Sequence, residues 1–390
     1  MDYRVQDERG IAADRPRSRG DGIAMYIDIL NNIRQFEEIR EIWERIYCAD
    51  PYTTVFVSWL WMRAWIETAG DNWFVLAVRP SDQKSYVAFL PLVTQSQSNG
   101  NCNAVQKLCL AGEKWADFTG LVCLPGYEER VVPALAGYIG NRLKWNVFQQ
   151  RNIADPRLDF LCKTFSRQKF TVTYKENKAC PYIELPGTYE QYLQESLGRN
   201  TRKHLRNYTR RIEQLTDFRA IPVRRDNLEL QIDTILTFYQ ERWGVKTEDM
   251  LRGYRELFRA AFENNFLWLT TLWEGATHIA GEACFLDHKM KMVYSYTGVF
   301  NKHYARLSPG NVMTAYAIRW AIEHGFRKYS FGAGDEHYKY LFGADEHFNR
   351  HVVVTRKSFI TRMKESISPK AKEFLKAAVH PFSAGRAQKP

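Results

Sequence analysis

Residues 305–343 read ARLSPGNVMTAYAIRWAIEHGFRKYSFGAGDEHYKYLFG, and this stretch decides the fold class. Ser308 favours the N-cap position and Pro309 the first helical turn, so we predict a helix over 309–324. Gly325 is the glycine expected just past a helix end, and a strand is predicted after it at 326–332. A further strand is expected before the helix, so the stretch predicts a strand–helix–strand crossover.

Helices and strands are predicted on both sides of this crossover. In the C-terminal half we expect a basic helix from 199 to about 216, then helices 227–243 and 249–264, strands 266–273, 277–286 and 290–297, and a last strand near 350–355. In the N-terminal half we expect helices 32–47, 58–70 and 127–142 and strands 73–78, 85–93, 104–112, 117–124 and 145–150. This alternation predicts an α/β fold.

The chain length favours two domains, because 390 residues exceed the usual size of a single core. The segment KENKACPYIELPGTYE (175–190) looks like the crossing between them. We therefore expect four parts: a polar leader at 1–22, an N-terminal domain at 23–178, a C-terminal catalytic domain at 179–355 and a basic amphipathic tail at 356–390.

The sequence contains neither a signal peptide nor a run of about 18 apolar residues, so we expect no membrane-spanning helix. The seven cysteines are odd in number and include no CxxC pair, which argues against a disulfide framework or a zinc site. The sequence thus predicts a cytoplasmic protein without a bound metal, with peripheral attachment at the inner membrane face as the alternative.

The net charge of +11 is concentrated in two segments. Residues 199–225 contain nine Arg and Lys against two acids, and residues 356–390 contain the same balance. On a helical wheel, four cations of the first segment form one stripe: Arg199, Lys203, Arg206 and Arg210. The stripe has no acidic partner at i±4, so we interpret it as an anion-binding surface for a phosphorylated carrier, an acidic glycan or a membrane, with nucleic acid as a lesser option.

Two features of the opening stretch predict chemistry. The helix start at Ser308 should leave three N–H groups free for a pyrophosphate, those of Gly310, Asn311 and Val312. The loop after the second strand carries five titratable or polar groups in succession, suited to proton transfer: Asp335, Glu336, His337, Tyr338 and Lys339. The alternative for this loop is a solvated turn.

The segment SPGNVM…AIEHGFRKYSFGAGDEHYK resembles the C-terminal signature of the CelD/BcsL-type GNAT acyltransferases. SLGRNTRKHLRNYTRR is similar to the Arg-rich helix of that family, FYQERW to its "RW" helix end and KWNVFQQRNI to its N-terminal strand. The likeness covers roughly residues 30–355. It implies two tandem GNAT-like halves with mixed, mostly antiparallel sheets, related to the FemX-type transferases, and it implies an acyl-CoA donor.

Position by position, the resemblance carries over to Ser308, Pro309, Gly310, Gly325, Phe331, Gly334, Tyr338 and Lys339, and on the basic helix to Arg199, Arg202, Arg206 and Arg210. Ser330 and Asn301 stand where the family commonly has Asp, which puts a proton acceptor at those positions in doubt. Arg306 is the one residue kept from the usual GNAT pyrophosphate loop, so we include it in the donor site.

A GNAT-type transfer needs a base, backbone donors for the thioester carbonyl and an acid for the thiolate. The candidates for the base are Glu282, Asp335 and Glu336. Tyr338 is the candidate acid, with Tyr294 and Tyr296 as alternatives; these two share one face of a strand, and sheet packing is the better explanation for at least one of them.

Three functions follow from these features. The first is transfer of an acetyl or other acyl group from acyl-CoA to an amine or hydroxyl, in polysaccharide or cell-envelope biosynthesis. The second is a FemX-like transferase that uses aminoacyl-tRNA. The third is a non-catalytic GNAT-like binding component, which the Ser330 and Asn301 departures favour.

Overall fold

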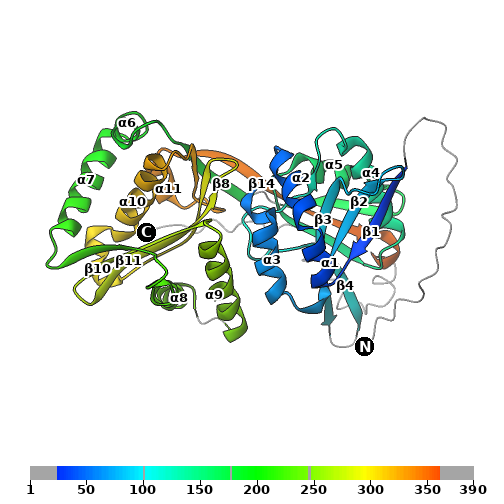
Figure 1. Ribbon diagram of the computed structural model, residues 1–390, viewed down its shortest axis with the longest axis horizontal. Coiled ribbons are helices and arrows are strands. Elements are labelled where there is room, and N and C mark those ends of the chain that lie inside the picture. Colours follow the sequence, from blue (N-terminus) through cyan, green and yellow to red (C-terminus); the bar gives the residue numbers. More distant parts are fainter. Residues whose placement is uncertain (1–23, 100–101, 176–177, 245–246, 361–390) are drawn as a thin grey trace, which may run out of the picture.

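The computed structural model describes residues 24–99, 102–175, 178–244 and 247–360, and it shows two α/β halves side by side (Figure 1). The predicted leader and nearly all of the predicted tail lie outside these ranges. Within them, fourteen strands form one continuous sheet in the order β1-β2-β3-β4-β6-β14-β8-β13-β12-β11-β10-β9, with β5 beside β3 and β7 beside β14. The mixed, mostly antiparallel sheet expected from the family resemblance is confirmed.

The N-terminal half contains, in chain order, β1 (Met25–Leu30), α1 (Ile33–Glu38), α2 (Arg40–Ala49), η1 (Val55–Val57), α3 (Trp59–Thr68), η2 (Gly70–Asn72), β2 (Trp73–Pro80), β3 (Ala88–Asn99), β4 (Cys102–Leu110), β5 (Val122–Cys123), α4 (Glu128–Asn141), β6 (Val147–Ile153), α5 (Pro156–Thr164) and β7 (Phe170–Tyr174).

The C-terminal half contains β8 (Lys178–Glu184), α6 (Tyr189–Glu195), α7 (Arg199–Glu213), β9 (Phe218–Pro222), α8 (Leu228–Trp243), α9 (Glu248–Glu263), β10 (Leu267–Glu274), β11 (Thr277–Asp287), β12 (Met292–Phe300), η3 (Lys302–Leu307), α10 (Pro309–Glu323), β13 (Lys328–Ser330), α11 (His337–Leu341) and β14 (Asp345–Arg356).

Each half has one short pair of parallel strands joined by a helix. In the C-terminal half, β10, β11 and β12 form an antiparallel meander, and α10 then crosses to β13, which runs parallel to β12. In the N-terminal half, α4 makes the corresponding crossover between the parallel strands β4 and β6. The predicted meander and crossover are therefore confirmed. Both parallel pairs span only three residues, after which their strands separate.

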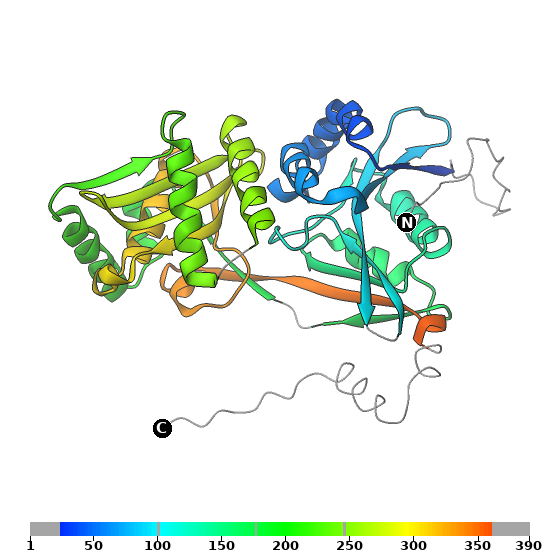
Figure 2. The ribbon, with the colours of Figure 1, turned by 90° about the horizontal axis from the view of Figure 1, so that it is seen from below.

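Strand β14 joins the halves. Its first residues, Asp345 to Asn349, pair with β8 in the C-terminal half, and its later residues pair with β6 and β7 in the N-terminal half. Figure 2 shows this long strand, in orange, running along both halves. The division into domains at residue 178 stays a prediction.

Several predicted elements differ from the structure. The helix expected at 32–47 is two helices, because Ile39 leaves the helical conformation between α1 and α2 (φ −95°, ψ 2°). Only β5 forms within the strand expected at 117–124, because Thr119 and Leu121 bond to residues near β6 instead. The strand expected at 326–332 is reduced to β13. The sequence did not indicate β1, β7, β8, β9 or α5, and the last residues of the loop expected at 333–339 begin helix α11 instead.

The two halves share a continuous apolar core. Helix α9 packs against α3 between them (Figure 1). Tyr294 of β12 lies against Phe56 and Phe118 of the N-terminal half, with ring centroids 5.2 and 5.8 Å apart. Tyr294 is therefore a packing residue of this interface. In addition, the ammonium group of Lys289, in the turn after β11, donates hydrogen bonds to the carbonyl oxygens of Tyr47 and Asp50.

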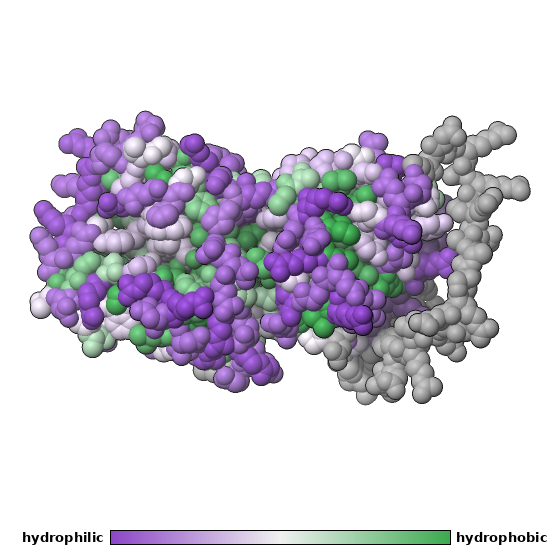
Figure 3. Space-filling model, viewed as in Figure 1, coloured by the Kyte–Doolittle hydropathy of each residue, from purple (hydrophilic) through white to green (hydrophobic). Residues whose placement is uncertain are grey.

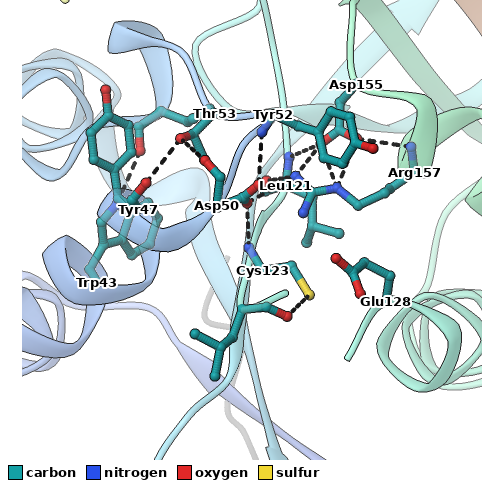
Figure 4. Close-up of polar contacts among 12 residues, drawn as sticks. Trp43, Tyr47, Asp50, Tyr52, Thr53, Leu121, Cys123, Glu128, Asp155 and Arg157 are labelled. Atoms are coloured by element: carbon teal, nitrogen blue, oxygen red, sulfur yellow. Dashed lines mark hydrogen bonds and ion pairs between the residues drawn. The ribbon is translucent and has the colours of Figure 1, made fainter. Parts of the chain in front are cut away.

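A buried ion cluster lies next to this contact (Figure 4). The Arg157 guanidinium donates to the carboxylates of Asp155 and Asp50 at 2.7 and 2.9 Å and to the Leu121 carbonyl at 2.7 Å. Asp50 also accepts from the N–H of Cys123 at 2.8 Å. All three charged side chains are at most 5% exposed. The cluster ties the loop after α2 to β5 and to the start of α5, and it therefore stabilises the N-terminal half.

Candidate active site

A cavity of about 770 Å³ opens where β12 and β13 separate, and we call it the C-terminal cavity. Its walls come from β11, β12, the first turn of α10 and the loop between β13 and α11. Eight of the residues singled out in the sequence line it together: Glu282, Tyr296, Gly310, Asn311, Phe331, Glu336, Tyr338 and Lys339. Residues about 60 positions apart in the chain are thus brought to one site; their individual roles stay predictions.

The first turn of α10 borders this cavity. Ser308 occupies the N-cap position as expected, but it has a left-handed backbone (φ 48°, ψ 52°) and its side chain makes no capping hydrogen bond. The N–H of Val312 donates to the Ser308 carbonyl at 3.2 Å, so the prediction that Val312 has a free N–H is wrong. Pro309 has no N–H, which leaves Gly310 and Asn311 as the residues whose N–H groups can bind an anion.

Glu282 lies in the wall of the cavity and is only 2% exposed. One carboxylate oxygen accepts hydrogen bonds from the hydroxyls of Ser295, at 2.5 Å, and Tyr329, at 2.6 Å. The other accepts from Thr314 at 3.4 Å. Burial raises the pKa of Glu282, and these hydrogen bonds offset only part of that effect. Glu282, Ser295 and Thr314 all line the cavity, whereas Tyr329 does not.

The loop before α11 supplies the opposite wall. Lys339 is almost fully buried; it pairs with the Glu336 carboxylate at 2.9 Å and donates to the Gly334 carbonyl at 3.1 Å. Lys339 therefore fixes the shape of the loop. Tyr338 lines the cavity, and burial, followed by the charges of Glu282 and Glu336, raises its pKa to about 12. The other two loop candidates, Asp335 and His337, are exposed and do not line the cavity.

Asp117 is a site residue that the sequence reading missed. It belongs to the N-terminal half but lines the C-terminal cavity, and it accepts a hydrogen bond from the Ala333 N–H. Gly332 leaves room for it, since a Cβ there would lie 2.6 Å from the Asp117 carboxylate. Burial raises the pKa of Asp117 to about 6. No motif marks this position in the sequence, because only the packing of the two halves brings it to the site.

A second cavity, of about 400 Å³, adjoins the first, and we call it the junction cavity. One side comes from the N-terminal half, at the point where β4 and β6 separate, and the other from α8, α9 and β12. The two cavities share six lining residues: Asp117, Lys178, Tyr239, Tyr296, Thr297 and Ala333. They are therefore neighbouring compartments, with Asp117 where they meet.

The remaining predicted residues lie elsewhere. Arg306 is exposed on η3 and does not line either cavity. The basic stripe is exposed on α7, at the strongly hydrophilic end of the molecule in Figure 3. Arg206 of the stripe pairs with Glu190 of α6 at 2.5 Å, so its charge is compensated from a neighbouring helix. Neither family departure faces the cavities: Asn301 caps η3, and Ser330 is fully buried.

Comparison with known proteins matches part of the chain to a family. Residues 199–340 match the family described as "Acetyltransferase (GNAT) domain". No curated protein matches the sequence.

Solved structures show the fold over most of the chain. FemX is 12% identical and covers 80% of this chain and 95% of its own, with a TM-score of 0.57. A conserved protein of unknown function from Bacteroides thetaiotaomicron VPI-5482 is 12% identical, covers 85% and 100%, and has a TM-score of 0.53. A tandem GNAT protein from the clavulanic acid biosynthesis pathway is 9% identical, covers 85% and 98%, and has a TM-score of 0.51. Residues 199–340 are therefore an acetyltransferase domain of the CelD/BcsL-type GNAT family, within a chain that has the two-part fold of FemX and tandem GNAT proteins.

Proposed function

We propose that this chain is an acyl-CoA-dependent acyltransferase that works from the C-terminal cavity. The observation that carries the proposal is the combination found there: an open gap between two parallel strands, free N–H groups at the start of α10, and a group of titratable side chains. A GNAT domain implies an acyl-CoA donor, and the other features match what that donor needs.

The donor would enter at α10. The N–H groups of Gly310 and Asn311, at the positive end of the helix dipole, are suited to the pyrophosphate of CoA. Beyond Tyr294, β12 is no longer paired with β13, so one edge of its backbone faces the gap. That edge can hydrogen-bond to the pantetheine arm and bring the thioester toward Ser295, where the cavity is lined by polar groups.

We assign the role of general base to Asp117. Its pKa of about 6 suits proton transfer near neutral pH, and it lies where the two cavities meet. Glu282, the base candidate from sequence, is less suited because hydroxyl donors already occupy both of its oxygens. We infer that Glu282 orients Ser295 instead.

The transfer requires one proton acceptor and one proton donor. An amine or hydroxyl of the acceptor attacks the thioester carbonyl, and its proton passes to Asp117. The C–S bond breaks, and the CoA thiolate takes a proton from Tyr338, whose raised pKa keeps the phenol protonated. Asp117 then releases its proton to solvent and Tyr338 takes one up from solvent, so both groups return to their starting states.

The proposal also includes the acyl group, the pathway and the cellular location. An acetyl donor and a role in polysaccharide or envelope synthesis rest on the sequence resemblance. A cytoplasmic location is likewise part of the proposal and rests on the sequence; the six cysteines whose side chains the structure describes are free. No described helix is long and apolar enough to cross a membrane.

Calorimetric titration with CoA and acetyl-CoA tests the function. We expect saturable binding that weakens at least about tenfold when Gly310 is replaced by proline, because the substitution removes one of the two N–H donors from the pyrophosphate site. Arg306→Gln is the matched control on the neighbouring exposed turn. Absence of binding to the unaltered protein at millimolar CoA would contradict the proposal.

A further inference from the structure

The donor site leaves the junction cavity unexplained. This cavity adjoins the C-terminal cavity, shares Asp117 with it, and is built from both halves of the chain. In the N-terminal half it begins where β4 and β6 separate, so it corresponds to the gap that β12 and β13 form in the other half. A substrate held there would lie beside the proposed base and next to the donor.

Three cations border the junction cavity: Lys114, Arg151 and Lys178. All are exposed at its mouth, and none forms an ion pair with another described residue. The positive charges of Arg151 and Lys178 also act on the neighbouring His351. Burial, followed by the charges of Arg151, Lys175 and Lys178, lowers the pKa of His351 to about 4. The carboxyls facing the same space are Glu113 and Asp117. Cations at the mouth of a cavity favour a ligand with an anionic group.

One wall of the cavity is aromatic. Trp115 of the N-terminal half lies against Tyr254 of α9, with ring centroids 4.9 Å apart, and Tyr296 and Phe258 continue the wall. Such a surface packs against the flat apolar face of a ring and leaves the polar groups of that ring directed elsewhere.

Two residues that line this cavity each have a buried side-chain oxygen without a partner among the described residues. Glu113 is 5% exposed; one oxygen accepts from Gln149 at 3.0 Å, and the other accepts from no group. Thr297 is 8% exposed, and its hydroxyl has no partner. Because buried polar atoms are costly when unpaired, both favour a ligand that brings hydroxyl or amine groups.

We propose that the junction cavity is the acceptor site, and that it takes a sugar carrying an anionic group, either phosphate or carboxylate. This inference rests on the proposed acyltransferase function. The sugar ring packs on the aromatic wall, its hydroxyls meet Glu113 and Thr297, and its anionic group is bound by Lys114 and Arg151. An amine or hydroxyl of the ring then faces Asp117.

Calorimetry on the CoA-saturated protein tests this with three amino sugars that share one ring: glucosamine, glucosamine 6-phosphate and 2-amino-2-deoxyglucuronate. We expect one or both anionic sugars to bind at least about tenfold more tightly than neutral glucosamine, since a charge-assisted hydrogen bond contributes at least that factor. The phosphate and carboxylate sugars distinguish the two kinds of anion.

The double variant Lys114→Gln/Arg151→Gln should abolish the preference without altering CoA binding, because neither residue lines the C-terminal cavity. Arg142→Gln/Lys144→Gln, exposed and outside both cavities, is the matched control and should keep it. Equal binding of the three sugars, binding of none, or a preference that survives the first double variant would each overturn the inference while CoA still binds. Loss of CoA binding by the unaltered protein would instead overturn the proposed function.

Discussion

Replacing Asp117 by asparagine should lower activity and raise stability at the same time. The amide oxygen can still accept from the Ala333 N–H, so the local geometry is retained while the negative charge and the base are lost. As a general base, the carboxylate contributes about 10²- to 10⁴-fold to the rate. We therefore expect kcat to fall by at least about a hundredfold, with CoA affinity unchanged.

The stability change follows from the pKa. Folding raises the pKa of Asp117 from 3.8 to about 6, so the folded protein disfavours the charged form. The resulting destabilisation is absent below about pH 4, grows as the pH rises through 6, and is complete above it. About two pKa units correspond to at most about 3 kcal/mol. The variant should thus be more stable than the unaltered protein at pH 8 and equally stable at pH 4.

Urea unfolding at both pH values measures the change in stability. The pH dependence of thiol release from acetyl-CoA, in the presence of an amino sugar, measures the change in activity. In the unaltered protein, the rate should rise with pH near 6, as the Asp117 carboxyl loses its proton. This ascending limb of the pH–rate profile should disappear in Asp117→Asn. It should persist in the control Asp335→Asn, which alters an exposed carboxyl outside the cavity. A retained limb, or a variant less stable at pH 8, would refute the assignment of this carboxyl as a buried base.

Three further outcomes test the structure. Glu282→Gln should keep the ascending limb of the pH–rate profile near pH 6. It should raise the free energy of unfolding more at pH 8 than at pH 4, because burial raises the pKa of the Glu282 carboxyl. Urea unfolding at the two pH values measures this difference. Arg157→Met should lower the unfolding free energy by about 3–5 kcal/mol in urea, because it leaves Asp50 and Asp155 buried without their cation. Calorimetry should find one CoA site per chain, because at the start of α4 the Glu128 carboxylate accepts from the Gly126 N–H at 2.7 Å and repels an anion.

Local signals predicted the C-terminal half well. Helices α8, α9 and α10 begin within a residue of the predicted starts. In the N-terminal half, Ser58 caps α3, where a helix was predicted from residue 58. These elements carry their own periodicity and end signals. Strand β8 was missed because its residues, KACPYIE, include a proline and follow a polar segment; its strand character comes from pairing with β13 and β14 on either side.

The residues of the candidate site likewise include some that the sequence predicted and one that it did not. Glu282, Gly310 and Tyr338 were found because each lies on a short motif or in an unusual sequence setting. Asp117 has no such context: it stands in a short loop after a turn, and it reaches the cavity beside Ala333, more than two hundred residues later in the chain. A single sequence does not reveal which loop of one half reaches into the cavity of the other.

The fold also explains why one chain would keep two copies of the same crossover. In the N-terminal half the helix start that could bind an anion is occupied by Glu128, yet the strands β4 and β6 still separate and leave a gap. That gap faces α8 and α9 and becomes part of the junction cavity. Because β14 pairs with strands of both halves, the gap is held in a fixed position relative to α10. A half without a donor site of its own can thus supply the wall, the cations and the carboxyl of Asp117 to the half that has one.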